Sequence, residues 1–174
     1  MKVTVYFDFL CPYCYRGVMD YMDLEQNYPD VETVWQPVEA HPRPEHMWMY
    51  SDIASEGLFY IKERGLNENE YIRLVYEAHY KNGRRIDAIN VLADIAEAAG
   101  VDKKDFLAAL KDRRYKKMIL DNNDLVWERL QFDAVPDYVT EKDGLYSIED
   151  HMISKEKLRS FLSGTVKSVN EDMK

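Results

Sequence analysis

The 174-residue sequence is poor in cysteine, glycine and proline, with two, seven and six of them. Two cysteines exclude the disulfide-rich scaffolds that hold many small secreted domains together. The low glycine and proline content, together with 46% hydrophobic residues, excludes collagen-like chains, low-complexity chains and wholesale disorder. The length suits one domain, or one domain that carries a large insertion.

Long hydrophobic runs and an excess of positive charge are also missing. No stretch approaches the roughly 18 apolar residues that a transmembrane helix needs, so no membrane partner is expected. The 32 acidic residues outnumber the 23 basic ones, and the resulting charge of −9 repels phosphate, so we expect no nucleic-acid partner. The N-terminal residues do not follow the pattern of a secretory signal peptide, which favours a cytoplasmic location.

Both ends of the chain carry strand patterns. Residues 3–7 and 31–35 are rich in β-branched and aromatic side chains and predict strands, with a helix between them whose first turn contains Pro12. Residues 137–148 predict a short hairpin with a tight turn at its middle. Ser154 is the expected N-cap of a final helix.

Helical patterns fill the middle of the chain, from about residue 50 to residue 131. Gly100 is a helix stop, and Asp102 is the expected N-cap of the helix that follows. A further helix is predicted over residues 115–130. The basic run 111–117 is interpreted as a solvated helix face, because the protein as a whole is strongly acidic.

This order of elements predicts an α/β fold. The two outer segments, residues 1–48 and 132–174, together form one discontinuous domain. Residues 49–131 form a helical domain inserted into it.

Cys11 and Cys14 lie where the first predicted strand gives way to the helix. Their spacing places both side chains on one helix face. Cys11 falls at the helix start, where free N–H groups and the helix dipole lower a thiol pKa from about 8.5 to between about 3.5 and 7.5. Cys14 lies deeper and is the natural resolving thiol. The pattern predicts that Cys11 attacks a disulfide and that Cys14 then attacks the mixed disulfide.

Two other interpretations of the pair remain. The cysteines could be two unreactive thiols at a helix start. They could also bind zinc together with His41 and His46, although the intervening loop is much longer than the roughly 12–15 residues of a zinc finger. We therefore predict no metal site.

Pro136 opens the returning strand near the C-terminus. A proline at this position cannot donate a hydrogen bond to a sheet. It is either an ordinary strand-entry proline or a cis proline beside the sulfur atoms. In the second case the Val135 backbone is free to pair with a substrate chain.

In combination these motifs resemble the thioredoxin-fold family of DsbA-like oxidoreductases, and in particular its FrnE-like branch. That branch is related to kappa-class glutathione transferases and 2-hydroxychromene-2-carboxylate isomerases. The local match runs over residues 6–17 and recurs at 36–39 and 96–100. The resemblance implies a thioredoxin-like fold with the helical domain inserted between a strand-helix-strand half and a hairpin-helix half. It also implies thiol-disulfide oxidoreductase activity through the Cys-Pro-Tyr-Cys pair.

The resemblance also assigns site residues. The expected catalytic residues are Cys11, Cys14 and Pro136, and the expected substrate-binding or tuning residues are Pro12, Tyr13, Val135 and Asp8. Asp8 is either a proton acceptor for Cys14 or an acid that positions the loop. Tyr13 supplies no cation between the cysteines, so we expect a weak oxidant with a potential of roughly −200 to −270 mV. Asp137, where the family commonly has a small polar residue, adds negative charge near the expected cleft.

A second function from another class remains open. In the isomerase and kappa-transferase relatives a serine typically occupies the position of Cys11, and glutathione is the cofactor. The alternative is therefore a glutathione-dependent isomerase or transferase that acts on a small aromatic or polyketide-like substrate. A third possibility is a metal-binding or chaperone-like module.

The cofactor and partner differ between these hypotheses. The dithiol mechanism requires no cofactor, with glutathione as an optional one. Its expected partner is a protein or small molecule that carries a thiol or a disulfide.

Overall fold

The computed structural model describes residues 1–149 and 151–164. The chain divides into two compact units: residues 1–36 together with residues from 131 onward, and residues 37–130. The sequence placed residues 37–48 with the first unit, whereas in the structure they group with the helical one. Asp150 and residues 165–174 of the expected C-terminal segment lie outside the described residues.

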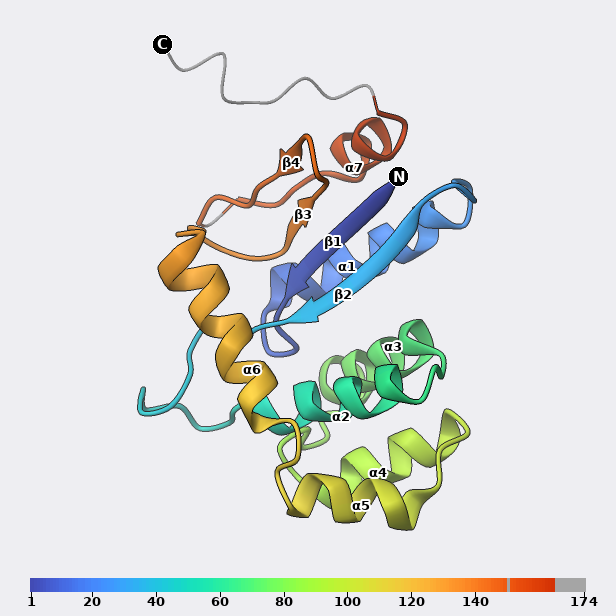
Figure 1. The fold of residues 1–174 in the computed structure, drawn as a ribbon, viewed down its shortest axis with the longest axis vertical. Helices are drawn as coiled ribbons and strands as arrows, with labels where there is room; N and C mark the ends of the chain where they lie inside the picture. The colour runs from blue at the N-terminus through green and yellow to red at the C-terminus, as the bar shows by residue number, and fades with distance from the viewer. Residues whose placement is uncertain (150, 165–174) are drawn as a thin grey trace. The chain divides into compact units, whose positions relative to one another are not determined.

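The first unit is a four-stranded sheet with helices packed against it, as expected for a mixed α/β fold (Figure 1). Its sheet has the strand order β2-β1-β3-β4, in which β3 is antiparallel to both β1 and β4. The connection from β1 to β2 runs through α1, which packs against α7. The elements are β1 (Lys2–Phe7), α1 (Pro12–Glu25), β2 (Glu32–Pro37), β3 (Asp137–Val139), β4 (Gly144–Leu145) and α7 (Lys155–Leu162).

An aromatic core joins α1 to the sheet. Phe7 of β1 contacts Trp35 of β2 edge to face, with ring centroids 5.7 Å apart. Tyr21 of α1 contacts Trp35 at 5.6 Å and stacks on Tyr138 of β3 at 5.4 Å. Such aromatic pairs contribute about 0.5–1.5 kcal/mol each beyond the area that they bury. The chain of rings fixes α1 on one face of the three longer strands.

The second unit consists of helices arranged around α2 (Figure 1). Tyr71 and Phe106 approach the backbone of α2 at Gly57, where a Cβ would lie 2.1 Å from the Tyr71 hydroxyl. That hydroxyl donates to the Ala54 carbonyl at 2.8 Å, so glycine at position 57 allows the contact. The elements are α2 (Asp52–Glu63), α3 (Glu68–Tyr80), α4 (Ile89–Ala98), α5 (Lys103–Lys111), α6 (Lys116–Asn123) and a π-helical segment (Asp124–Arg129). None of the helices in the described ranges is long and apolar enough to cross a membrane.

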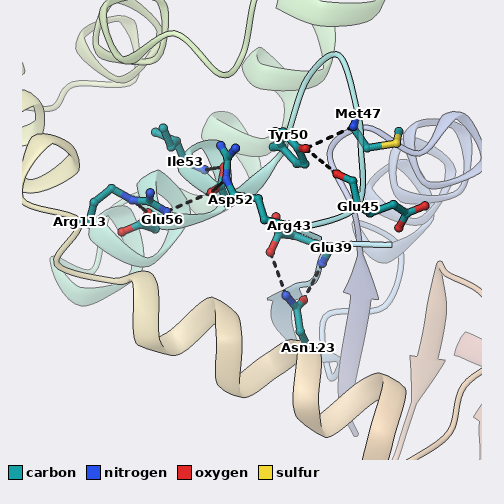
Figure 2. Close-up of polar contacts among 10 residues, drawn as sticks. All are labelled: Glu39, Arg43, Glu45, Met47, Tyr50, Asp52, Ile53, Glu56, Arg113 and Asn123. Atoms are coloured by element: carbon teal, nitrogen blue, oxygen red, sulfur yellow. Dashed lines mark hydrogen bonds and ion pairs between the residues drawn. The ribbon is translucent and has the colours of Figure 1, made fainter. Parts of the chain in front are cut away.

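Hydrogen bonds to α6 explain why residues 37–48 belong to the helical unit. The Glu39 backbone N–H donates to Asn123 Oδ1 at 2.8 Å, and Asn123 Nδ2 donates to the Glu39 carboxylate at 2.9 Å (Figure 2). Trp127 Nε1 donates to the Glu39 carbonyl at 2.7 Å. Trp127 lies in the π-helical segment, which occupies the second half of the helix predicted over residues 115–130.

The basic run 111–117 is only partly the solvated face that the sequence suggested. Arg113 lies between α5 and α6 with a φ of 51° and pairs with two acids of α2, Asp52 and Glu56 (Figure 2). Both carboxylates are buried, and Glu56 is fully so. The interpretation of this run was therefore wrong for Arg113, because two buried carboxylates need a cation beside them.

Candidate active site

The loop between β1 and α1 places Cys11 at the start of the helix. Cys11 is the N-cap residue of α1, and Pro12 occupies the first turn, as the sequence predicted. The Cys11 backbone N–H donates to the Asp8 carbonyl at 3.3 Å, and the Leu10 N–H donates to Asp8 Oδ1 at 2.9 Å. Asp8 is buried, and these two contacts hold the loop in shape.

Cys14 lies one turn along the same helix face and is fully buried, whereas Cys11 is partly exposed. The Cys14 backbone N–H donates to Cys11 Sγ at 3.3 Å. Cys14 Sγ in turn accepts the Asp8 backbone N–H at 3.4 Å. Both residues are present as thiols, with one sulfur accessible and the other enclosed.

These surroundings shift the two thiol pKa values in opposite directions. A hydrogen bond from the Cys14 side chain and backbone N–H donors hold the pKa of Cys11 below its usual value, against the effects of burial and of the Asp8 charge. Burial raises the pKa of Cys14 well above its usual value, and its neighbour Cys11 adds to the rise. Cys11 is therefore the thiol that ionises first, in agreement with its position at a helix N-terminus.

The Val135–Pro136 peptide bond is cis and lies beside the sulfur atoms. The Cys11 thiol donates to the Val135 carbonyl at 3.7 Å, which brings together two residues that lie 124 positions apart in the sequence. Of the two interpretations that the sequence allowed for Pro136, the structure has the cis one. Tyr13, between the two cysteines, has an exposed side chain.

Asp137 follows the cis proline but does not extend into solvent. It is buried, and burial raises its pKa from the ordinary value of 3.8 to about 7. Its Oδ1 accepts the Ser147 backbone N–H at 2.5 Å, and the Ser147 hydroxyl donates to the Pro136 carbonyl. Asp137 therefore brings less negative charge to the cleft than an ordinary aspartate would, because a pKa of about 7 leaves part of this carboxyl neutral near pH 7.

Two residues near the cysteines were not predicted as functional from the sequence. Gly17 is buried on the Cys14 face of α1, and a Cβ there would lie 2.9 Å from Pro136 Cγ and 2.7 Å from the Tyr138 hydroxyl. The signal in the sequence was the spacing of three between Cys14 and Gly17. Tyr138 was recognised only as a strand residue, since nothing local indicates where its hydroxyl lies.

No metal site accompanies the cysteines in the part of the chain that the structure describes. No three side chains of histidine, cysteine, aspartate or glutamate gather there in a way that could hold a metal ion. His41, one of the two histidines weighed as a ligand, instead contacts Glu45 at 2.8 Å.

Comparisons with known proteins relate this arrangement to a family. Residues 2–154 match the family model described as a DSBA-like thioredoxin domain. The chain is 26% identical over 174 residues to the uncharacterised protein YwbO of Bacillus subtilis, and the match covers 80% of this chain and 86% of that protein.

Solved structures share the fold at low sequence identity. The cytosolic disulfide reductase DsbM from Pseudomonas aeruginosa, solved with GSH, is similar with a TM-score of 0.74 and 16% identity, over 94% of this chain and 98% of that one. A 2-hydroxychromene-2-carboxylate isomerase is similar with a TM-score of 0.70 and 16% identity, over 94% of each chain. These likenesses and the match to the family model confirm the predicted thioredoxin-like fold, and the chain belongs to the DsbA-like thioredoxin domain family.

Proposed function

We propose that the protein is a thiol-disulfide oxidoreductase in which Cys11 is the attacking thiol and Cys14 the resolving thiol. The observation that supports this most directly is the contrast between the two sulfurs. One is partly exposed, accepts an N–H at the start of α1 and has a lowered pKa, while the other is buried beside it with a raised pKa. A nucleophile must be accessible and ionised, whereas a resolving thiol acts only inside the protein.

In the reducing direction the Cys11 thiolate attacks one sulfur of a client disulfide. The client S–S bond breaks, and its other sulfur leaves as a thiolate that takes a proton. Cys14 then loses its proton and attacks Cys11 Sγ, which releases the second client sulfur. The client gains two electrons and the protein forms the Cys11–Cys14 disulfide. The same steps in reverse oxidise a client dithiol.

The cis Pro136 and the Val135 backbone shape the place where the client lies. The Val135 carbonyl is within 3.7 Å of Cys11 Sγ, so a client strand that pairs with this backbone would bring its sulfur to Cys11. We infer a thiol- or disulfide-containing protein or small molecule as the client. Asp8 acts as the residue that positions the loop, since its carbonyl and carboxylate hold the N–H groups of Cys11 and Leu10.

The mechanism needs no bound cofactor. We infer a cytosolic location and glutathione as the small thiol that returns the pair to the reduced state, in line with the similar fold of DsbM, which is described as cytosolic and was solved with GSH.

Client trapping tests the proposal. We expect Cys14→Ser to hold a client as a mixed disulfide on Cys11, and Cys11→Ser to trap nothing and to lose the acceleration of insulin reduction by dithiothreitol. Mass spectrometry of the trapped species identifies the client. Equal trapping by both variants, or undiminished insulin reduction by Cys11→Ser, would contradict the assigned roles.

The second candidate is a glutathione-dependent isomerase or transferase, which the similarity of fold to the isomerase favours. It needs one sulfur at most, because glutathione supplies the other. Full turnover of a small aromatic substrate by Cys14→Ser in the presence of glutathione would support this candidate over the first.

A further inference from the structure

The Tyr138 side chain lies under α1 on the same side as Cys14. Its ring stacks on Tyr21 with centroids 5.4 Å apart and planes 21° apart. Its hydroxyl would be 2.7 Å from a Cβ at Gly17, which is one turn after Cys14. Glycine at position 17 thus leaves space for this hydroxyl against the helix.

The hydroxyl is fully buried and has no hydrogen-bond partner among the described residues. A buried hydroxyl without a partner costs free energy of folding, so its retention calls for an explanation. Burial raises the pKa of Tyr138 well above its usual value, and after burial the charge of Cys14 is the largest cause. Cys14 and Gly17, which the hydroxyl approaches, are both buried and lie one turn apart on α1, so the hydroxyl and the Cys14 thiol lie on the same buried side of this helix.

Cys14 carries negative charge only while the Cys11–Cys14 disulfide closes or opens. When it attacks Cys11 Sγ it must lose its proton, and when the Cys11–Cys14 disulfide is opened by a client thiolate it leaves as a thiolate. The sulfur is then an anion without contact with water. In the resting thiol form, the Asp8 backbone N–H at 3.4 Å is its one donor among the described hydrogen bonds.

We propose that the Tyr138 hydroxyl stabilises the negative charge on Cys14 Sγ as the Cys11–Cys14 disulfide closes and opens. The inference rests on the proposed function, because it assigns a helper to the resolving thiol. The phenol stays protonated at every pH at which the protein works, so it offers a neutral donor throughout. Because Tyr138 acts through Cys14, it is a positioning residue for the charged sulfur.

A donor of this kind has a kinetic signature. It stabilises the thiolate and the transition state, where charge lies on Cys14 Sγ, but neither the disulfide nor the protonated thiol. Its removal should slow disulfide closure and disulfide opening by the same factor and leave the redox potential unchanged. A merely structural role would instead alter the stability or the potential.

Tyr138→Phe removes only the hydroxyl, and Tyr21→Phe is the matched control. The Tyr21 hydroxyl belongs to the other ring of the same stacked pair and contacts Thr33 Oγ1 at 2.9 Å instead of approaching Cys14. The chromogenic disulfide dithiobis-nitrobenzoate separates the steps. Attack by Cys11 releases one coloured thiolate, and resolution by Cys14 releases the second.

For Tyr138→Phe we expect an unchanged first release and a second release slowed about ten-fold, the order of effect for a lost hydrogen bond to a charged group. Opening of the oxidised protein by dithiothreitol should slow by the same factor, at an unchanged potential against glutathione. Tyr21→Phe should match wild type in both phases. An unchanged second release in Tyr138→Phe, or a shifted potential, would overturn the inference. Absence of the second release in wild type would instead overturn the proposed function.

Discussion

Cys11 and Cys14 are separated by two residues, yet one is an accessible thiol with a lowered pKa and the other an enclosed thiol with a raised pKa. The helix start supplies N–H donors to Cys11, and the buried face of α1 removes water from Cys14. The asymmetry therefore follows from one helical turn of displacement and not from any charged neighbour. A basic residue between the cysteines is unnecessary in such an arrangement.

The first prediction concerns the ionisation of Cys11. The largest cause of its lowered pKa is the hydrogen bond from the Cys14 side chain, so Cys14→Ala should raise the pKa of Cys11. Thiolate absorbance followed against pH, and the alkylation rate at neutral pH, report this directly. Cys14→Ser retains a hydroxyl donor and should lie between wild type and Cys14→Ala. A Cys11 pKa that stays the same in Cys14→Ala would contradict the stated cause.

The second prediction concerns Asp137, whose pKa rises from 3.8 to about 7 on burial. Below the unfolded pKa both states are protonated and the group has no effect. As the pH rises toward about 7, the unfolded state ionises while the folded state does not. The free energy of unfolding should then fall by up to about 1.4 kcal/mol per pH unit from this group.

Asp137→Asn removes that dependence. Its stability relative to wild type should increase between about pH 4 and about pH 7 and stay level above that range, as measured by urea unfolding. Asp133→Asn is the control, because Asp133 is exposed and raises the pKa of Asp137 only as a secondary cause. If the free energies of unfolding of wild type and Asp137→Asn change in parallel with pH, this carboxyl ionises normally.

Local patterns predicted the cysteine pair and its helix well, since N-capping and the first-turn proline depend on neighbours in the sequence. They could not place Tyr138 or Ser147, because these meet the site through the pairing of β3 with β1 and β4. The cis state of Pro136 was one of two open interpretations for the same reason. The cis state depends on the residues that pack against Pro136. One of them is Gly17 of α1, which is distant from Pro136 in the sequence.

At the scale of elements, the sequence predicted helix ends and turns but not the π-helical segment that follows α6. Asp102 and Ser154 are the N-caps of α5 and α7, and each side chain accepts a backbone N–H of its first turn. The π-helical segment after α6 has no local signature. It coincides with the hydrogen bond from Trp127 to the segment that follows β2, which is a tertiary contact.

The third prediction concerns the link between α2 and the turn after α5. Arg113→Met keeps much of the bulk of the side chain but leaves Glu56 buried without its cation, and leaves Asp52 with Arg43 alone at 3.4 Å. We expect a loss of about 3 kcal/mol in the free energy of unfolding, somewhat reduced because Arg113 is 31% exposed. The loss should shrink in mild acid, since burial already raises the pKa of Glu56.

Lys117→Met, in the same basic run, is the control. Its ion pair with Asp121 is solvent-exposed, with 84% of the lysine side chain accessible. Such pairs contribute about 0–1 kcal/mol, so this variant should stay near wild type. Equal losses in the two variants would show that the buried pair is no stronger than the surface pair.

The fourth prediction belongs to the whole molecule and its charge of −9. A field of this sign favours cationic over anionic disulfides in the encounter with Cys11. Cystamine should therefore react several-fold faster than oxidised glutathione. The ratio should approach the intrinsic ratio of the two reagents at about 1 M salt, where screening extends only about 3 Å. A ratio that does not depend on salt would mean that local contacts alone set the preference.

The insertion of residues 37–130 between the β1-α1-β2 segment and β3 has a consequence for biosynthesis. At about 5–20 residues per second, a ribosome needs roughly 7–26 seconds to proceed from Phe7 to Val139. The helical unit is contiguous and is complete before β3 emerges. Until then the cysteine half lacks Tyr138 and Pro136, so the newborn chain presents Cys14 without the residues that later enclose it.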